Sequence, residues 1–582
     1  MKNCISKPSA LSALVVAFAL SGLMTSCDDM LSTDSEFVQF AEDNTLSHPE
    51  DSIFSVMGII RDMQVIADRI VLLGELRGDL VVPTDNATKD IKNMAAFHFN
   101  EENQYNRISD FYAVINDCNY FLAHADMDLE RLGKVVFERE FAAVKTFRAW
   151  TYLQLAKIYG EVPLVLDPIL TEADAQHAME LKPSGMKEIC DYFITDIADY
   201  VDTEFPQYGQ MGSYNSEQFF IPVRVLLGEL SLWAGYYDDA AYYLIDYLTQ
   251  RNHPVSTGIT SADWHENIDN FATAIPGGSF SSMFATSRSE EVISMIPMED
   301  NEYYGVRSYL PSIFSSMENS NHGFFQVTPS QAMFDYSSAE DYCYLYTTKV
   351  GKDTIYVQKN NLQRKYYAGD LRFSQTYTYR TINRDEFSKY SSTDQQITKH
   401  RGLYVVTYRR QQVYLMLAEA LNRANCPETA MCILKYGLTN LNISRYISER
   451  EMMDLHINLR SFNDDVFNES NTQGIHSRGC GEAECDTLYT LPMPEMALAS
   501  YADTVAYQVP LVEDMIMREM TLEKAFEGQR YYDLMRVALR RGEPDYLAKP
   551  VAYRTGVEDA ALRSLLMNQA NWYLPIEPVS LK

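Results

Sequence analysis

The sequence predicts a mostly α-helical protein: a tetratricopeptide-like helical solenoid with a long loop-rich insertion that carries short strands. Three observations support this fold class. Residues 135–160 are apolar nearly all round and contain no proline, as expected for a buried helix that ends at Gly160. Helical segments recur in pairs, each a helix, a short turn and a second helix. Residues 252–401 lack helical periodicity.

The first element resembles an export signal. Residues 10–23 are almost wholly apolar and follow Lys2 and Lys7, which fits a signal peptide and is too short for a membrane-spanning helix. Cys27 stands where an ordinary signal would be cut, and this arrangement resembles the lipobox of bacterial lipoproteins, in which the cysteine is lipidated. We expect residues 1–26 to be a lipoprotein signal peptide; the alternative is an ordinary signal with a chance cysteine.

The next helical pairs follow in order. Pro163 stops the first helix from continuing after Gly160. In residues 222–250, one helix is expected to end near Gly235, and Asp238 or Asp239 to cap the next. Small residues in that second helix allow close packing. Residues 405–422 with 427–441 predict a third pair, and residues 512–541 a fourth.

The long insertion divides these pairs. It is rich in Ser, Thr, Tyr, Phe, Gly and Asn, and TIYVQ and YTYRTI within it predict short strands. A loop region this long is normally functional. We therefore predict a signal (1–26), an N-terminal part with two helical hairpins (27–250), a ligand-binding insertion (251–404) and a C-terminal part with two hairpins (405–582).

Charge and cysteine content exclude several classes of protein. The 582 residues carry a net charge of −31, and −33 without residues 1–26, which hold two lysines and no acid, so nucleic acid is not an expected partner. Nine cysteines in this length do not form a disulfide framework. Cys480 and Cys485 could form a local disulfide; the alternative is that both are free thiols. HSRGCGEAEC lacks paired CxxC spacing, so we predict no metal, and no other cofactor.

Several segments together resemble the SusD/RagB family of surface lipoproteins. They are EREFAAVKTFRAWTYLQLAKIYGEVPLV (138–165), VYLMLAEALNRA (413–424), REMTLEKAFEGQRYYDLMR (518–536) and the final YLPIEPVSL. The resemblance implies a lipid anchor on Cys27, with Asp28 and Asp29 as a surface-export signal; a merely solvated acidic linker is the alternative. It also implies an outer-membrane location and a SusC-like TonB-dependent transporter as partner.

The FEGQR motif is expected to be structural. Glu527, Arg530 and Asp533 lie three residues apart, which would place them on one helix face in a buried Arg–carboxylate network. The alternative is a carboxylate pair for glycoside hydrolysis. The sequence contains no HExxH, GxSxG, P-loop or GxGxxG motif, and we assign no catalytic residue.

Ligand contacts are expected from aromatic rings with polar neighbours. Trp150 and Trp233 fall on solenoid helices and are expected in the core. The predicted ligand-binding residues lie in the insertion and in the loop of residues 74–90: Trp264, Tyr303, Tyr304, Arg307 and Tyr309, and Arg77, Asp79, Asp85 and Asn86. The alternative for the aromatic residues is that they lie at the surface or in the core of the loop region. The alternative for residues 74–90 is a solvated loop.

The function predicted from the resemblance is non-catalytic. The protein would bind an oligo- or polysaccharide and deliver it to the transporter, acting as its lid. The first alternative is the same role with peptide cargo, which the low number of tryptophans, four in the chain, slightly favours. The others are a surface glycoside hydrolase and a structural lipoprotein without a small ligand.

Overall fold

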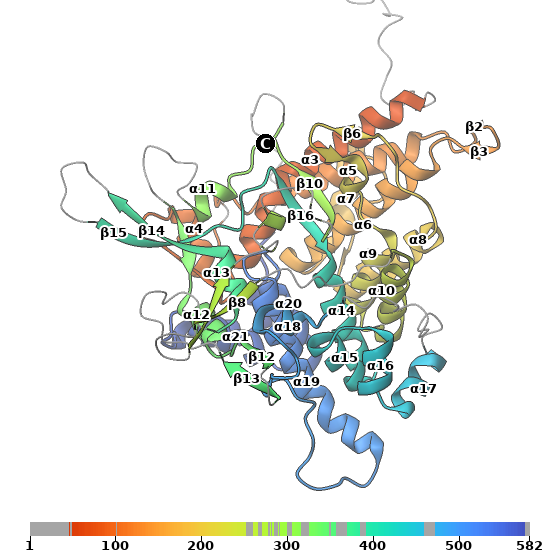
Figure 1. Ribbon diagram of the computed structural model, residues 1–582. Coiled ribbons are helices and arrows are strands. Elements are labelled where there is room, and N and C mark those ends of the chain that lie inside the picture. Colours follow the sequence, from red (N-terminus) through yellow and green to blue (C-terminus); the bar gives the residue numbers. More distant parts are fainter. Residues whose placement is uncertain are drawn as a thin grey trace, which may run out of the picture. The chain divides into compact units, whose positions relative to one another are not determined.

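The computed structural model is mostly helical, as predicted (Figure 1). It describes residues 46, 49–100, 102–251, 260–265, 271–276, 280, 282–284, 289, 291–299, 305–315, 325–347, 351–356, 369–383, 391–458 and 472–576. Residues 47–582 form one compact unit. The longer helices are α3 (Pro49–Leu76), α5 (Ile108–His124), α6 (Glu138–Tyr159), α8 (Met186–Ile197), α9 (Val223–Ala234), α10 (Tyr237–Arg251), α14 (Arg410–Arg423), α15 (Pro427–Lys435), α17 (Glu449–Asn458), α19 (Tyr501–Glu523), α20 (Arg530–Arg541) and α21 (Asp545–Tyr553).

Shorter helices and two-stranded sheets complete the described chain. The short helices are α4 (Lys89–Ala95), α7 (Glu172–Glu180), α11 (Leu310–Phe314), α12 (Gln331–Ser338), α13 (Leu371–Thr376), α16 (Asn440–Tyr446), α18 (Ile475–Cys480) and α22 (Ala560–Leu566). The sheets pair β1 (Val81–Pro83) with β11 (Val327–Pro329), β2 (Glu130–Arg131) with β3 (Lys134–Val135), β4 (Val162–Pro163) with β5 (Pro183–Ser184), β6 (Gln210–Met211) with β7 (Tyr214–Asn215), β8 (Thr260–His265) with β9 (Phe271–Pro276), β10 (Val292–Pro297) with β16 (Tyr404–Arg409), β12 (Cys343–Thr347) with β13 (Lys352–Tyr356), and β14 (Tyr377–Asn383) with β15 (Ser391–Ile397).

The helices pack in sequence order as a solenoid does. In the series α5, α6, α8, α9 and α10, each helix contacts the next. Helix α10 then packs against α14, although residues 252–409 separate the two in sequence. The predicted α9–α10 hairpin is confirmed. Gly235 ends α9 in the left-handed conformation, with φ of 85°. Asp238 and Asp239 lie in the first turn of α10 rather than at its cap.

Two predicted helix boundaries were wrong. The fourth pair was expected to start at residue 512, but α19 begins at Tyr501, where the Ser500 side chain caps it. Residues 404–409 form strand β16, antiparallel to β10, and α14 begins only at Arg410. The sequence YVVTYR is rich in β-branched and aromatic residues, which favour a strand where a partner is available. This strand pair and the β1–β11 pair join the insertion to the helices that flank it.

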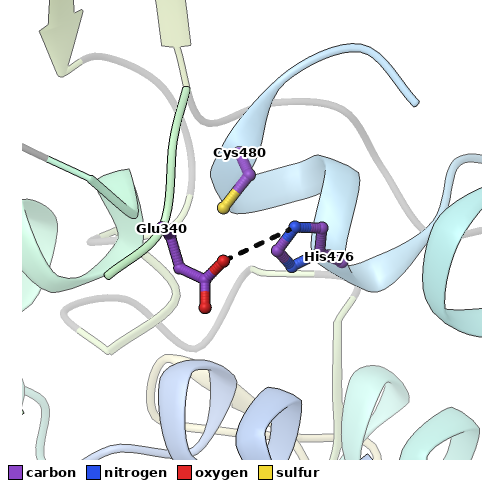
Figure 2. A group of neighbouring side chains, drawn as sticks. All are labelled: Glu340, His476 and Cys480. Atoms are coloured by element: carbon purple, nitrogen blue, oxygen red, sulfur yellow. Dashed lines mark ion pairs between the residues drawn. The ribbon is translucent and has the colours of Figure 1, made fainter. Parts of the chain in front are cut away.

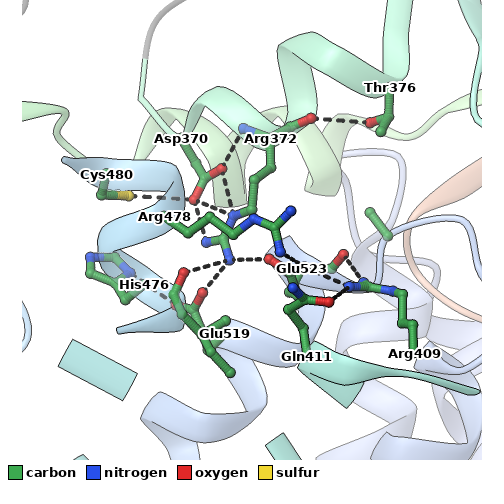
Figure 3. A network of polar contacts seen from close by, with 12 residues as sticks. Asp370, Arg372, Thr376, Arg409, Gln411, His476, Arg478, Cys480, Glu519 and Glu523 are labelled. Carbon is green, nitrogen blue, oxygen red and sulfur yellow. Dashed lines mark hydrogen bonds and ion pairs between the residues drawn. The ribbon is translucent and has the colours of Figure 1, made fainter. Parts of the chain in front are cut away.

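A buried ionic network holds the C-terminal half together (Figure 3). Glu523 on α19 pairs with Arg372 Nη1 at 2.8 Å and with Arg409 Nη1 at 2.6 Å, and all three side chains are fully buried. Burial alone would raise the pKa of Glu523, but these arginines and Arg478 lower it to about 2. The network therefore links α13 of the insertion to α19 and to the start of α14.

The FEGQR residues form ion pairs inside the protein, and Glu527 shares Arg409 with this network, but the three do not share one helix face. Glu527 precedes α20 in a turn and accepts hydrogen bonds from Arg409 and Lys399. Arg530 pairs with Asp79, and Asp533 pairs with Lys524 at 2.7 Å. The predicted ion pairing of these residues is confirmed. The shared face was wrong because the chain turns between Glu527 and Arg530.

The described cysteines are buried free thiols, so Cys480 and Cys485 form no disulfide. Trp150 is 4% exposed, as expected for the core, and Trp572 is fully buried. Trp233 is half-buried between Lys157 and Arg536, at 5.6 and 5.3 Å from its ring centroid.

Candidate ligand-binding surface

Arg77, at the end of α3, lies in the core. Its guanidinium donates to the carbonyls of Leu73 and Trp572 at 3.0 and 2.9 Å and to the Tyr532 hydroxyl at 2.8 Å, and it stacks over Tyr531. The side chain is fully buried. Arg77 therefore holds the C-terminal segment and does not face a ligand.

Asp79 is also a structural residue. Its two carboxylate oxygens accept bidentate hydrogen bonds from Arg530 at 2.8 and 2.9 Å, and Oδ2 accepts another from the Tyr336 hydroxyl at 3.0 Å. It is fully buried. The expectation that Arg77 and Asp79 contact a ligand fails because burial against α20 uses their polar atoms.

The chain leaves the core through β1 and presents the next polar residues to solvent. Beyond β1, the Thr84 N–H donates to the Gln326 carbonyl at 2.8 Å, and the Thr88 N–H donates to the Gln326 side chain at 2.9 Å. Asp85 and Asn86 lie between these anchors and are exposed. The turn is thus positioned by the insertion itself.

Segment 305–309 of the insertion is anchored on α3. Asp68 accepts from the Ser308 hydroxyl at 2.8 Å and from the Tyr309 N–H at 2.6 Å. Burial raises the pKa of Asp68 to about 7, although these hydrogen bonds oppose the shift. The Val306 N–H donates to Gln64 at 3.2 Å, and Arg307 in the same segment is exposed.

The loop after α4 meets the insertion through a pair of tyrosines. The rings of Tyr105 and Tyr309 lie 6.2 Å apart between centroids. Tyr105 donates its N–H to the Asn103 side chain, which in turn donates to the Asp90 carbonyl at the start of α4. In Figure 1, α4 and α11 mark the two segments. We call the exposed polar residues of these loops the Tyr105–Tyr309 surface: Asp85 and Asn86 in the turn after β1, Glu102, Gln104 and Arg107 near Tyr105 in sequence, and Arg307 near Tyr309 in sequence.

This surface combines carboxylates, amides and guanidinium groups beside tyrosine rings. Such a set can donate to and accept from the hydroxyls of a sugar or the backbone of a peptide. Tyr309 is half-buried, and Tyr105 is 7% exposed. Glu102, Gln104 and Arg107 were not predicted, because their place in the fold depends on the turn after α4.

The leading aromatic candidates of the insertion stay predictions. Trp264 lies on β8, with its backbone opposite Ala272 on β9. Its side chain lies outside what the structure describes, and so do Tyr303 and Tyr304.

A hollow separate from this surface lies against the C-terminal segment. It has a volume of about 840 Å³ and is lined by the aromatic residues Phe97, Phe99, Tyr159 and Tyr573, with Glu161 and Asn571 among its polar residues. This volume lies within the range of small-molecule sites. The aromatic pair in AAFHFN was its one signal in the sequence.

Comparison with solved structures defines the class of fold. A SusD superfamily protein from Bacteroides vulgatus aligns with a TM-score of 0.53 and 15% identity, over 91% of this chain and 96% of its own. A SusD-like protein from Bacteroides fragilis gives 0.54 and 16%, over 88% of each chain. A SusD-like carbohydrate binding protein from Bacteroides vulgatus gives 0.50 and 14%, over 84% of each chain. This protein therefore has the SusD-like fold that the sequence predicted.

No family model and no curated protein matches the sequence. Among the residues that the structure describes, no helix is both long and apolar enough to cross a membrane.

Proposed function

We propose that this protein is a non-catalytic, lipid-anchored lipoprotein of the SusD/RagB family at the outer-membrane surface. It binds an oligo- or polysaccharide, delivers it to a SusC-like TonB-dependent transporter and acts as the transporter's lid. The observation that carries the proposal is the SusD-like fold over nearly the whole chain. One structure with this fold is described as a carbohydrate binding protein, which supports a glycan as cargo.

The proposed ligand site is the Tyr105–Tyr309 surface together with Trp264, Tyr303 and Tyr304. The described part of this site supplies hydrogen-bonding groups, and the rings of the insertion would supply stacking faces. Peptide cargo is the alternative, because the same polar groups can bind a peptide backbone.

A glycoside hydrolase would need a general acid whose pKa is raised. Glu527 of the FEGQR motif does not fit this role. Burial alone would raise its pKa, but Arg409 and Lys399 outweigh burial and lower it. Its oxygens are also occupied by hydrogen bonds from these two cations.

Binding is best tested by calorimetric titration of the detergent-solubilised full-length protein with panels of glycans and peptides. Arg307→Ala should weaken binding about 10- to 100-fold, as expected when a hydrogen bond to a charged group is lost. Arg131→Ala, which removes an exposed arginine on the β2–β3 hairpin, is the matched control and should bind normally.

Trp264→Ala and Tyr304→Ala should also weaken binding without unfolding the protein. Unchanged affinity in both rings and in Arg307→Ala would reject this site. Loss of binding in Phe99→Ala alone would move the ligand to the aromatic hollow. Binding of peptides but not glycans would support the alternative cargo.

The transporter is tested separately. The full-length protein extracted from outer membranes should copurify with a TonB-dependent barrel. A pull-down that recovers the protein without any barrel would contradict the proposed partner.

A further inference from the structure

Three side chains from two segments far apart in the sequence converge in the core (Figure 2). Glu340 follows α12 of the insertion, and His476 and Cys480 lie four residues apart on α18, so they share one face of that helix. All three are buried, and their ligand-type atoms lie within 4.8 Å of one another. Asp486 adds a fourth group, with Oδ2 at 3.2 Å from His476 Nε2.

The hydrogen bonding of His476 fixes the direction of its free nitrogen. Nδ1 lies 2.9 Å from Glu519 Oε2 and holds a proton that this carboxylate accepts. Nε2 then faces Asp486 Oδ2 at 3.2 Å and Glu340 Oε2 at 4.0 Å. A bare nitrogen lone pair facing two carboxylates is unfavourable, so a proton or a metal ion must lie between Nε2 and these groups.

A proton accounts for only part of this arrangement. A single N–H on Nε2 can serve Asp486 but leaves Glu340 Oε2 without a hydrogen-bond donor among the residues that the structure describes. Glu340 is fully buried, and its other oxygen, Oε1, pairs with Arg518. A buried carboxylate oxygen without a donor is costly, which favours a cation at this point.

The geometry points to a buried site for a divalent, zinc-like metal ion bound by Glu340 Oε2, His476 Nε2, Cys480 Sγ and Asp486 Oδ2. A mixed set of imidazole, thiolate and carboxylate ligands suits Zn²⁺. Tetrahedral zinc places its ligand atoms about 3.3–3.8 Å apart. The atoms of the three converging side chains therefore need to approach one another by at most about 1.5 Å.

The outer shell of the site supports the assignment. A histidine ligand commonly donates its second N–H to a carboxylate, as His476 does to Glu519. Tyr489 stacks on the imidazole, with 3.6 Å between ring centroids, and is 2% exposed. The ring is therefore held in one orientation and shielded from water.

Metal binding would replace two protons. Burial and Asp370 raise the pKa of the Cys480 thiol, which donates to Asp370 at 3.3 Å in the metal-free protein. On binding, the thiol and Nε2 each release a proton, and the ion supplies two positive charges, so the net charge of the cluster does not change. Arg372 pairs with Asp370 and limits its repulsion of the thiolate.

Four protein ligands would leave no open coordination position, so the ion would be structural rather than catalytic. It would clip the insertion at Glu340 to α18 and to the segment at Asp486. The inference is independent of the proposed cargo, because these residues lie in the core and not on the Tyr105–Tyr309 surface.

The test uses the full-length protein in detergent, stripped with a chelator and dialysed against Zn²⁺ or Co²⁺. We expect about one tightly held Zn²⁺ per chain and a higher melting temperature. The Co²⁺ form should show thiolate-to-cobalt charge-transfer absorption, which ions bound at surface carboxylates cannot produce.

Cys480→Ser should remove the charge-transfer band, and Cys118→Ser, a buried thiol on α5, should retain it. Glu340→Gln should weaken Zn²⁺ binding at least tenfold and serves if Cys480→Ser does not fold. The absence of retained zinc, or a charge-transfer band that persists in Cys480→Ser, would overturn the proposal and leave His476 as a protonated partner of Glu519 and Asp486.

Discussion

At the scale of single residues, burial decides which polar groups hold the fold and which can meet a ligand. Arg77, Asp79 and Arg530 are almost or fully buried, with their polar atoms paired inside the protein. Asn86, which follows Asp79 closely in sequence, and Arg307 of the insertion are exposed. Residue type alone did not separate the two groups, because an arginine beside an aspartate suits either role.

Arg530→Ala should lower the stability of the protein without a specific effect on binding. Removal of one partner of a buried ion pair costs about 3–5 kcal/mol, because Asp79 stays buried without its cation. Thermal unfolding measures the loss, and titration of the folded fraction should give normal affinity.

Arg563→Ala is the control for this variant, because Arg563 also pairs with carboxylates but at the surface. Its melting temperature should stay close to that of the wild type. An Arg530→Ala protein of wild-type stability that has lost binding would contradict the structural role.

Glu75 should make the protein less stable as the pH rises. Burial raises its pKa from 4.5 to about 8, against the opposing Gly528 N–H and Lys399. The folded state therefore keeps a proton that the unfolded chain has lost, and this contribution falls as the pH rises from about 4.5 through 8.

Glu75→Gln resembles the protonated side chain and keeps an acceptor for the Gly528 N–H. Urea unfolding at pH 5 and pH 8 should show a smaller loss of stability in this variant than in the wild type. Equal losses in the two proteins would show that Glu75 does not titrate in this range.

At the scale of elements, the turn between α19 and α20 is built to dock on α3. A Cβ on Gly74 would lie 1.8 Å from the Gly528 carbonyl oxygen, so the two backbones meet where neither residue has a side chain. The Lys399 ammonium also holds this turn, since it donates to the Ala525 carbonyl at 2.8 Å. The FEGQR motif therefore packs the α19–α20 hairpin against α3.

Gly528→Ala should be strongly destabilising for two separate reasons. Its φ of 78° disfavours alanine, and the new Cβ would lie 2.5 Å from Val71 Cα. Gly133 has a similar φ of 74°, but no atom of the described residues lies within 4 Å of its Cβ position. Gly133→Ala should thus cost only about 1–2 kcal/mol for the backbone.

Overpacking should add about 1–3 kcal/mol in Gly528→Ala. Unfolding midpoints of the two variants measure the difference directly. Equal losses in both would show that the α3 contact contributes nothing beyond backbone conformation.

At the scale of the whole molecule, the insertion is fastened to the helical frame at several points. The strand pairs β1–β11 and β10–β16 attach it by hydrogen bonds, and Arg372 joins it to α19 by ion pairs. Residues 47–582 accordingly form one compact unit. The predicted boundaries at residues 251 and 404 divide the sequence, but elements on either side of both boundaries pack against each other.

The lipid anchor is a prediction about the whole protein. Cys27 lies outside the described residues. Cys27→Ala should release the protein from the outer membrane or mislocalise it. The substitution removes the residue that would carry the acyl chains, and stable attachment needs more than one such chain. Fractionation of cells measures this, and a variant that still sediments with outer membranes would contradict the anchor.

The sequence by itself determined the helical frame and its class. Apolar periodicity and terminating glycines predicted α6, α9 and α10, and the resemblance predicted the SusD-like fold, because these signals are local and each helix carries its own. Arg530 was expected in a buried ionic network, and it lies in one.

Only the tertiary structure decided which partners distant residues find. Residues 404–409 became a strand because β10 lay beside them, and Asp79 was taken into the core by Arg530, 451 residues away in the chain. Likewise, Glu340 meets His476 and Cys480 only in the folded chain. Burial and long-range pairing depend on which segments the fold brings together, and no local pattern in the sequence carries that information.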